Sequence, residues 1–241
     1  MKTEIPITEH PKLPEGVPLV ANFNDDRNRL SYYFPLLREI DGVRTPVTEF
    51  FAVDGHLETF PEIEYREITR FMQDIGTTNA FVRGDFSSGK YDGNEGSKIE
   101  SQDAVDIENV VLEMFRQLAL SGRHLGRRIA VREWIPHDAE VRFFVRDGQV
   151  VYAGTLDDVP DAEFPDLQAE LVAEAFDTFA WSVDFIRNEF SGKWYCIDMG
   201  LDGLYHDGEG WISISEHLSE EHSLERYFEA MPEPQRFRHR R

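Results

Sequence analysis

Hydrophobic residues recur every three or four positions in four stretches of the chain, with polar residues between them. In one stretch, Ile68, Phe71, Met72 and Ile75 fall on a single face, and Gly76 follows where a helix commonly ends. This spacing is typical of amphipathic helices that pack one face against a core. The pattern predicts helices over residues 28–40, 65–75, 105–120 and 167–179.

Elsewhere the apolar residues form short runs or alternate with polar ones, which predicts β-strands. The expected strands cover residues 43–53, 80–82, 129–135, 140–146, 149–155, 182–188 and 194–199. Asp147 and Gly148 separate two of these strands and favour a tight hairpin turn, and residues 190–193 turn a second hairpin. Helices and hairpins alternate without a regular strand–helix–strand repeat. This order favours an α+β fold with antiparallel sheets over a doubly wound parallel sheet.

The composition is strongly acidic. The 241 residues include 46 acidic and 25 basic side chains, giving a net charge of −21, and only five of the basic residues are lysines. Uniform acidity with arginine in place of lysine is typical of halophilic proteins, whose carboxylates stay hydrated in strong salt. Unspecific binding to nucleic acid needs a basic surface, so a nucleic-acid partner is not expected.

Three features bear on the cellular compartment. No run of about 18 apolar residues occurs, so we expect neither a membrane span nor a membrane partner. Residues 1–16 lack the apolar core of a signal peptide. A single cysteine, Cys196, allows no intrachain disulfide, which fits a reducing compartment. Together these features predict a cytoplasmic protein.

A loop of small residues between two cations is the first candidate site. Arg83 ends a short apolar strand, and Ser87, Ser88 and Gly89 follow before Lys90. Phosphate oxygens need positive charge and close backbone N–H groups, which small residues leave accessible. The segment does not fit the Walker pattern. It indicates either a binding site for a nucleoside triphosphate or an ordinary surface loop.

A second candidate site combines a strand end with the strand that follows it. Glu133, Trp134 and Ile135 run into a proline, where backbone N–H and C=O groups become available to the edge of an adenine base. Arg142 and Glu140 on the next strand are two positions apart and share one face. The same alternation is also found on any half-exposed strand.

Two carboxylates form the third candidate site. Asp184 and Asp198 each interrupt an apolar strand, where a charge is costly unless it is paired or bound to a metal. The hairpin between these strands can bring both residues to one face. Mg²⁺ is commonly held by one or two carboxylates together with substrate phosphates. In so acidic a chain, however, a single aspartate carries little information.

Taken in order, these segments resemble the ATP-grasp superfamily, including its bacterial, phage and haloarchaeal domains. The matching runs are residues 42–51 with the entry strand, 80–83 with the strand of the phosphate-contacting lysine (here Arg83), 87–90 with the mobile loop, 131–135 with the adenine-binding strand, and 184 and 197–200 with the two metal-ligand strands. The run from Glu140 to Val145 is similar to one in the translation-initiation-factor assembly chaperones of this superfamily. Gly200, two residues after Asp198, stands where ATP-grasp proteins usually have asparagine.

The resemblance implies a two-lobed ATP-grasp fold with antiparallel sheets and flanking helices. Its N-terminal lobe would cover residues 42–130 and its C-terminal lobe residues 131–241 with an acidic tail, after an irregular and helical segment over residues 1–41. The implied ligands are ATP and Mg²⁺. The implied site has Arg83, Ser87, Ser88, Lys90 and Arg142 at the phosphates, Glu133, Trp134 and Ile135 at adenine, and Asp184 and Asp198 at Mg²⁺.

The implied activity is ATP-dependent ligation of a carboxylate to an amine or thiol through an acyl phosphate. Arg142 and Lys90 would be the catalytic cations, and the acceptor would be a small molecule or a protein. Two alternatives stay open. One is a non-catalytic, ATP-dependent assembly factor or binding module. The other is a covalent nucleotidyl ligase that uses Lys90 of the run Lys-Tyr-Asp-Gly, although the sequence has no Lys-x-Lys of the kind such ligases need.

Overall fold

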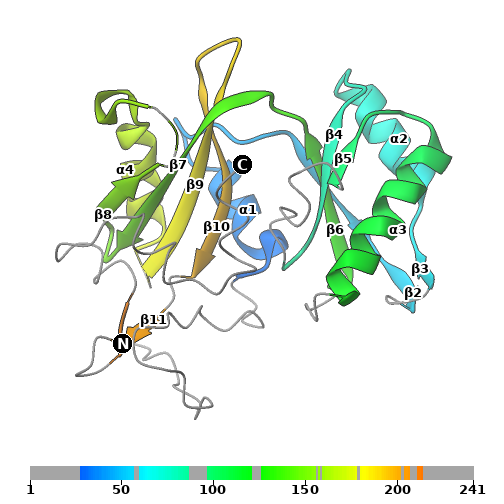
Figure 1. Ribbon diagram of the computed structural model, residues 1–241, viewed down its shortest axis with the longest axis horizontal. Coiled ribbons are helices and arrows are strands. Elements are labelled where there is room, and N and C mark those ends of the chain that lie inside the picture. Colours follow the sequence, from blue (N-terminus) through cyan, green and yellow to red (C-terminus); the bar gives the residue numbers. More distant parts are fainter. Residues whose placement is uncertain are drawn as a thin grey trace.

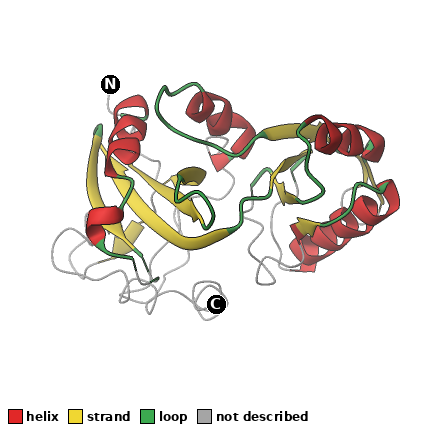
Figure 2. Cartoon of the chain, turned by 90° about the horizontal axis from the view of Figure 1, so that it is seen from above, coloured by secondary structure: helices red, strands yellow, loops and turns green. Residues whose placement is uncertain are grey.

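Two four-stranded antiparallel sheets form the frame of the protein in a computed structural model (Figure 1). The structure describes residues 28–56, 60–86, 97–120, 126–155, 157, 159–177, 180–201, 204–206 and 211–213. Seen from above, the sheets lie side by side and helices cover their outer sides (Figure 2). The predicted α+β architecture with antiparallel sheets is confirmed. No helix within the described residues is long and apolar enough to cross a membrane.

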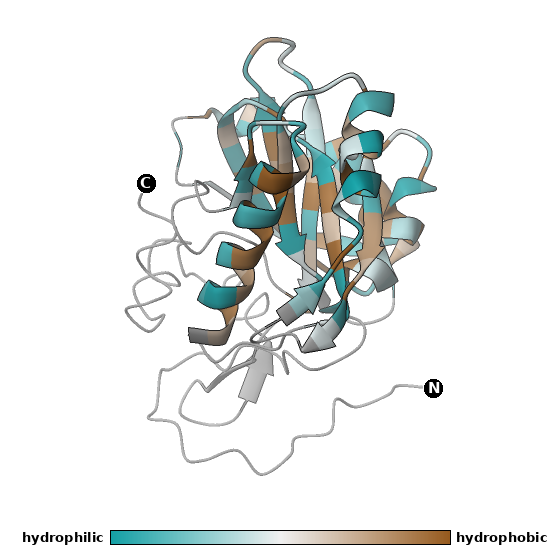
Figure 3. Cartoon of the chain, turned by 90° about the vertical axis from the view of Figure 1, so that its right-hand side faces the viewer, coloured by the Kyte–Doolittle hydropathy of each residue, from teal (hydrophilic) through white to brown (hydrophobic). Residues whose placement is uncertain are grey.

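The N-terminal sheet has the strand order β1-β6-β4-β5. Its strands are β1 (Thr48–Ala52), β4 (Ala80–Gly84), β5 (Lys98–Ile99) and β6 (Arg128–Glu133). Helices α2 (Tyr65–Asp74) and α3 (Ala104–Leu120) cover one face. Their apolar stripes pack with Val82 of β4 and Val131 of β6 in one core cluster. Hydrophilic residues occupy the outward sides of these helices (Figure 3).

The C-terminal sheet has the strand order β10-β9-β7-β8. Its strands are β7 (His137–Arg146), β8 (Gln149–Gly154), β9 (Ala180–Asn188) and β10 (Trp194–Leu201). Alternate residues of β7 and β9 pack with helices α1 (Leu30–Arg38) and α4 (Asp166–Ala175) in a second core cluster. The residues between them, Glu140, Arg142, Asp184 and Ile186 among them, therefore lie on the opposite face of the sheet.

The helical spacing and the first hairpin turn predicted these elements well. All four expected helices are present, with ends that differ by at most four residues. Asp147 and Gly148 both have positive φ angles, 51° and 76°, as a two-residue turn between β7 and β8 requires. The first expected strand is shorter than residues 43–53, because regular pairing of β1 begins only after Pro46, at Thr48.

Several very short strands were not expected from the sequence. They are β5 and two small hairpins, β2 (Asp54–His56) with β3 (Phe60–Glu62) and β11 (Leu204–His206) with β12 (Trp211–Ser213). Each has only two or three residues, which is too few for a period-two pattern to show. The acidic tail beyond residue 213 lies outside the described residues.

Candidate functional site

Two arginines lie on the face of the N-terminal sheet that α2 and α3 leave open. Phe81 of β4 pairs with Arg132 of β6, and Arg83 of β4 pairs with Ala130. Side chains alternate along a strand, and Val82 and Val131 pack toward the helices. Arg83 and Arg132 therefore point the other way, toward the C-terminal sheet.

The C-terminal sheet carries a row of three charged residues. Arg142 of β7 lies opposite Asp184 of β9, which in turn lies opposite Asp198 of β10. The guanidinium of Arg142 grips the Asp184 carboxylate with two bonds, Nε to Oδ1 at 2.6 Å and Nη2 to Oδ2 at 2.7 Å. Such side-on, two-point pairs are among the strongest that proteins form.

A register shift in β10 brings Asp198 into this row. Cys196 pairs with Phe185 on the core side of the sheet, and the next pair is Asp198 with Asp184, so Ile197 is an extra residue. Without that bulge, Ile197 would stand opposite Asp184 and Asp198 would face the core. The bulge therefore aims the carboxylate at the N-terminal sheet.

Asp198 is the point where three elements meet. Its Oδ1 accepts from the Tyr33 hydroxyl of α1 at 2.5 Å and from the Met199 amide at 2.9 Å, and it lies 2.9 Å from Nη1 of Arg83. Burial, and then the neighbouring Asp198 charge, raise the pKa of Tyr33 well above its usual value. The phenol therefore stays protonated and keeps donating its hydrogen bond.

Arg132 crosses between the sheets beside this cluster. Its Nη1 donates to the Ile197 carbonyl at 2.6 Å, and its side chain is almost fully buried. Nε and Nη2 have no hydrogen-bond partner among the described residues. Burial, and then the nearby Arg83 charge, lower the pKa of Arg132 to about 10. The aromatic rings of Phe34 and Phe81 flank the guanidinium, with their centroids 5.6 and 5.9 Å from Cζ.

Arg83, Arg132 and Asp198 line a cleft between the two sheets, with about 530 Å³ of empty space that is partly open to solvent. Glu133 and Glu140 add negative charge to its lining, and Phe81 and Trp134 add aromatic surface. The two rings are 6.2 Å apart, and Lys98 Nζ lies 5.0 Å above the Trp134 ring. The cleft therefore combines flat apolar surface with buried positive charge.

The segment from Glu133 to Ile135 also lines the cleft. The Glu133 amide donates to the Val47 carbonyl at 2.8 Å, and the Trp134 amide donates to the Asn79 carbonyl at 3.4 Å. The Ile135 carbonyl contacts Nδ1 of His137 at 3.1 Å. These contacts hold the segment as it leaves β6 and enters β7.

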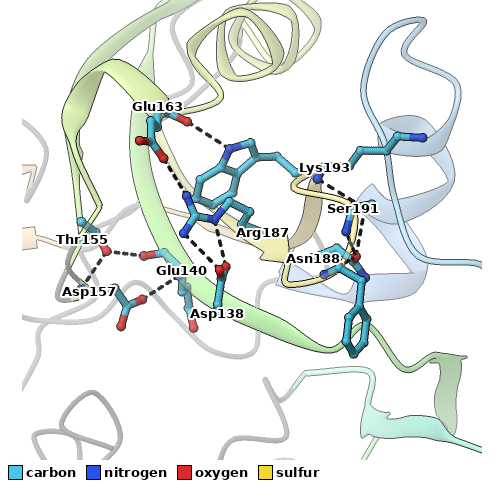
Figure 4. A network of polar contacts seen from close by, with 11 residues as sticks. Asp138, Glu140, Thr155, Asp157, Glu163, Arg187, Asn188, Ser191 and Lys193 are labelled. Carbon is cyan, nitrogen blue, oxygen red and sulfur yellow. Dashed lines mark hydrogen bonds and ion pairs between the residues drawn. The ribbon is translucent and has the colours of Figure 1, made fainter.

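A separate polar network joins β7 and β9 of the C-terminal sheet to the segment that follows β8 (Figure 4). Arg187 forks onto Asp138, with Nε to Oδ1 at 2.9 Å and Nη2 to Oδ2 at 3.1 Å, and its Nη1 donates to Glu163 at 2.7 Å. The Thr155 hydroxyl donates to the Glu140 carbonyl, and the Glu140 amide donates to Asp157. Of these residues, only Glu140 lines the cleft.

Residues 35–204 match the family model of the ATP-grasp domain, R2K clade family 3. The chain belongs to this ATP-grasp family. No curated protein sequence matches it significantly. The resemblance that the sequence motifs suggested is thereby confirmed.

Solved structures show the same ATP-grasp fold. The D-alanine–D-alanine ligase of Coxiella burnetii superposes with a TM-score of 0.53 at 14% identity, over 85% of this chain and 55% of that one. C-terminally truncated Cdc123 of Schizosaccharomyces pombe gives 0.51 at 16% identity, over 76% and 87%. The biotin carboxylase domain of Hydrogenobacter thermophilus 2-oxoglutarate carboxylase, solved with MgADP, gives 0.50 at 17% identity, over 72% and 39%. At such identities the likeness concerns the fold alone.

The ATP-grasp domain brings most of the predicted site residues together. Arg83, Glu133, Trp134, Ile135 and Asp198 line the cleft. Arg142 and Asp184 are paired with each other in the row that contains Asp198. Ser87, Ser88 and Lys90 lie outside the described residues. The roles assigned to all these residues stay predictions.

Other residues of the cleft were not expected from the sequence. In the sequence, Arg132 resembles any charged residue of a half-exposed strand. Only the structure shows its place opposite Phe81 of β4. Tyr33 belongs to the apolar stripe of α1, so the sequence pattern predicts only a core position for it. Its partner Asp198 is 165 residues away, and no local signal joins the two.

Two carboxylates side by side on one face suit a single Mg²⁺ whose other ligands come from phosphates and water. Within the described ranges, no three His, Cys, Asp or Glu residues are grouped so that they could hold a metal by themselves. Gly200 adds no ligand, although a Cβ there would meet only Ser182 Oγ at 3.6 Å and Asn28 Oδ1 at 3.9 Å. The donor set therefore fits a metal that arrives with a nucleotide better than one held by the protein alone.

Proposed function

We propose that this ATP-grasp domain binds Mg-ATP in the cleft between the two sheets. The observation that carries the proposal is the pairing of aromatic surface with buried arginines in one cleft of an otherwise acidic chain. In a protein with a net charge of −21, Arg83 and Arg132 bring two guanidinium groups to a cleft that Glu133, Glu140 and Asp198 also line, and they would supply the positive charge that a polyanion needs.

The adenine base would lie near Trp134 and Phe81, at the segment from Glu133 to Ile135. Because the amides of Glu133 and Trp134 donate within the protein, hydrogen bonds to the base would come from the Ile135 amide and the carbonyls of this segment. The backbone would thus form hydrogen bonds with the edge of the base, and the rings of Trp134 and Phe81 would remain available for stacking.

The phosphates of ATP would replace the aspartate carboxylates as partners of Arg83 and Arg142. Arg83 is paired with Asp198 at the cleft wall, and Arg142 is paired with Asp184 in the row of charged residues that contains Asp198. A bound Mg²⁺ would neutralise phosphate charge, with Asp184 and Asp198 as its protein ligands. Released by their acids, Arg83 and Arg142 could then turn to phosphate oxygens.

The activity that fits best is ATP-dependent ligation of a carboxylate to an amine or thiol. Phosphoryl transfer to the carboxylate depends on positioning and charge neutralisation, so it needs cations rather than a nucleophilic side chain. Arg142, together with Lys90, would stabilise charge on the transferred phosphoryl group. The acceptor would be a small molecule or a protein.

The substitution Asp198→Asn tests the metal assignment. We expect the affinity for ATP in Mg²⁺ to fall about tenfold, because one charged ligand is lost. The affinity for metal-free ATP should stay the same or rise, because Arg83 loses its competing carboxylate. Isothermal calorimetry with and without Mg²⁺ measures both values.

Asp138→Asn is the matched control, because Asp138 is also gripped by an arginine but lies outside the cleft. It should leave both affinities unchanged. Equal ATP affinity of Asp198→Asn and the unaltered protein in Mg²⁺ would contradict the metal assignment. Failure of the unaltered protein to bind ATP under either condition would contradict the proposed function itself.

A non-catalytic, ATP-dependent assembly factor or binding module is the second candidate. It is favoured by Gly200 in place of the usual asparagine and by the resemblance of residues 140–145 to the assembly chaperones. Release of ADP in the presence of pooled amino acids and small carboxylates separates the two functions. A ligase gives turnover that depends on the pool, and an assembly factor binds ATP without such turnover.

A further inference from the structure

Arg132 stands out because it is a buried charge without a carboxylate. It is 4% exposed, and its one hydrogen-bond partner is the neutral carbonyl of Ile197. Asp198, the acid beside it, already accepts from Arg83, Tyr33 and Met199 on its Oδ1. Asp198 thus serves Arg83 rather than Arg132, and burying a charge is costly unless it is paired.

The unpartnered atoms form one defined edge of the guanidinium. Nε and Nη2 of Arg132 have no partner within the described part of the chain. With the same two atoms, Arg142 grips both oxygens of Asp184 in this protein. That edge matches two oxygens of a carboxylate or of a phosphoryl group.

The surroundings keep this edge ready for an anion. The rings of Phe34 and Phe81 lie beside the guanidinium, which limits the directions in which the group can turn. The side chain lines the cleft together with Arg83. Nε and Nη2 have almost no exposed surface and no partner among the described residues, so an anion would reach them by displacing neighbouring side chains of the cleft and would then become their partner.

From these contacts we infer that Arg132 and Arg83 form a seat for one oxyanion in the wall of the cleft. The ligand class is a phosphoryl group of the nucleotide or a carboxylate of the acceptor. The inference rests on the proposed function only for the source of that anion. Arg132 would hold two of its oxygens with Nε and Nη2, while Nη1 stays on Ile197.

The experiment compares Arg132→Met with Arg116→Met in the full chain. Methionine keeps much of the length of Arg132 between the two rings, and Arg116 is an exposed arginine of α3 that controls for the lost charge. Inorganic pyrophosphate and malonate are the probes, followed by thermal shift and calorimetry. We expect at least one probe to stabilise the unaltered protein and Arg116→Met, and Arg132→Met to bind it about tenfold or more weakly.

Binding of pyrophosphate alone assigns the seat to a phosphoryl group, and binding of malonate alone assigns it to a carboxylate. If neither anion binds the unaltered protein, or if Arg132→Met binds both equally well, the seat does not exist. ATP binding by a protein in which neither pyrophosphate nor malonate binding depends on Arg132 would overturn the inference and leave the proposed function standing. Anion binding through Arg132 without any ATP binding would do the reverse.

Stability provides a second readout, which separates a ligand seat from a structural arginine. Without anions, Arg132→Met should melt at the same temperature as the unaltered protein or higher, because an uncompensated buried charge is removed. Arg132→Lys should fold and bind the anion with intermediate affinity, because it keeps the charge but loses the two-point grip. If both variants fail to fold, Arg132 is structural and the inference is wrong.

Discussion

The two arginine–aspartate pairs at the cleft look alike but are built differently. Arg142 and Asp184 are direct partners on neighbouring strands of one sheet, joined by two hydrogen bonds. Arg83 and Asp198 belong to different sheets and form an ion pair in which Nη1 lies 2.9 Å from Oδ1. The backbone ladder fixes the first pair, whereas the second depends on how the two sheets are placed. We therefore expect the first pair to contribute more to the stability of the fold than the second, in addition to the ligand roles proposed for its residues.

The largest expected effect comes from breaking the pair inside the sheet. Arg142→Met leaves Asp184 buried, with a carboxylate that has lost both hydrogen bonds from Arg142. Removal of one partner from a buried pair destabilises a protein by about 3–5 kcal/mol. Urea unfolding measures the loss, and the double variant Arg142→Met with Asp184→Leu should recover most of it. A loss below about 1 kcal/mol for the single variant would show that the pair is not a fold element.

Breaking the pair between the sheets should cost less. In Arg83→Met, Asp198 keeps its bonds from the Tyr33 hydroxyl and the Met199 amide, so about 1–3 kcal/mol of the unfolding free energy should be lost. The same variant should bind ATP at least tenfold more weakly, measured by calorimetry. A stability loss as large as that of Arg142→Met, with unchanged ATP affinity, would reverse the roles of the two pairs.

The smallest effect concerns the third element at Asp198. Tyr33→Phe removes one hydrogen bond and should lower stability by about 1 kcal/mol at neutral pH. The pKa of Tyr33 is raised in the folded protein, so its contribution is complete below the unfolded value near 10 and is lost as the pH rises above it. The stability difference between Tyr33→Phe and the unaltered protein should therefore shrink above pH 10. A difference that stays constant from pH 8 to 11 would contradict this assignment.

Local patterns in the sequence were sufficient for the elements and for one side of the cleft. The helical stripes predicted α1 to α4, and alternation placed Glu140 and Arg142 on one face of β7. The hairpin of β9 and β10 was expected to bring Asp184 and Asp198 together, and their register shows them directly opposite. These features depend on periodicity and turn chemistry, which act over a few residues.

The remaining parts of the cleft depend on contacts between distant segments. Tyr33 contacts Asp198 although 165 residues separate them in the chain. The surroundings of Arg132 are set by its contacts with Phe81 and Ile197. The bulge in β10 has no recognisable signature in the run from Trp194 to Gly200. No periodic pattern carries such information, because it arises only when the two sheets pack against each other.

The extra residue in β10 has a consequence for how this protein can vary. Ile197 contributes a backbone carbonyl to Arg132 and, by its presence in the strand, turns the next side chain toward the cleft. What matters at this position is thus the number of residues more than their kind. Divergent relatives could exchange the side chain of residue 197 for another that fits the cleft lining, whereas the loss of a single codon there would rotate the following carboxylate into the apolar core.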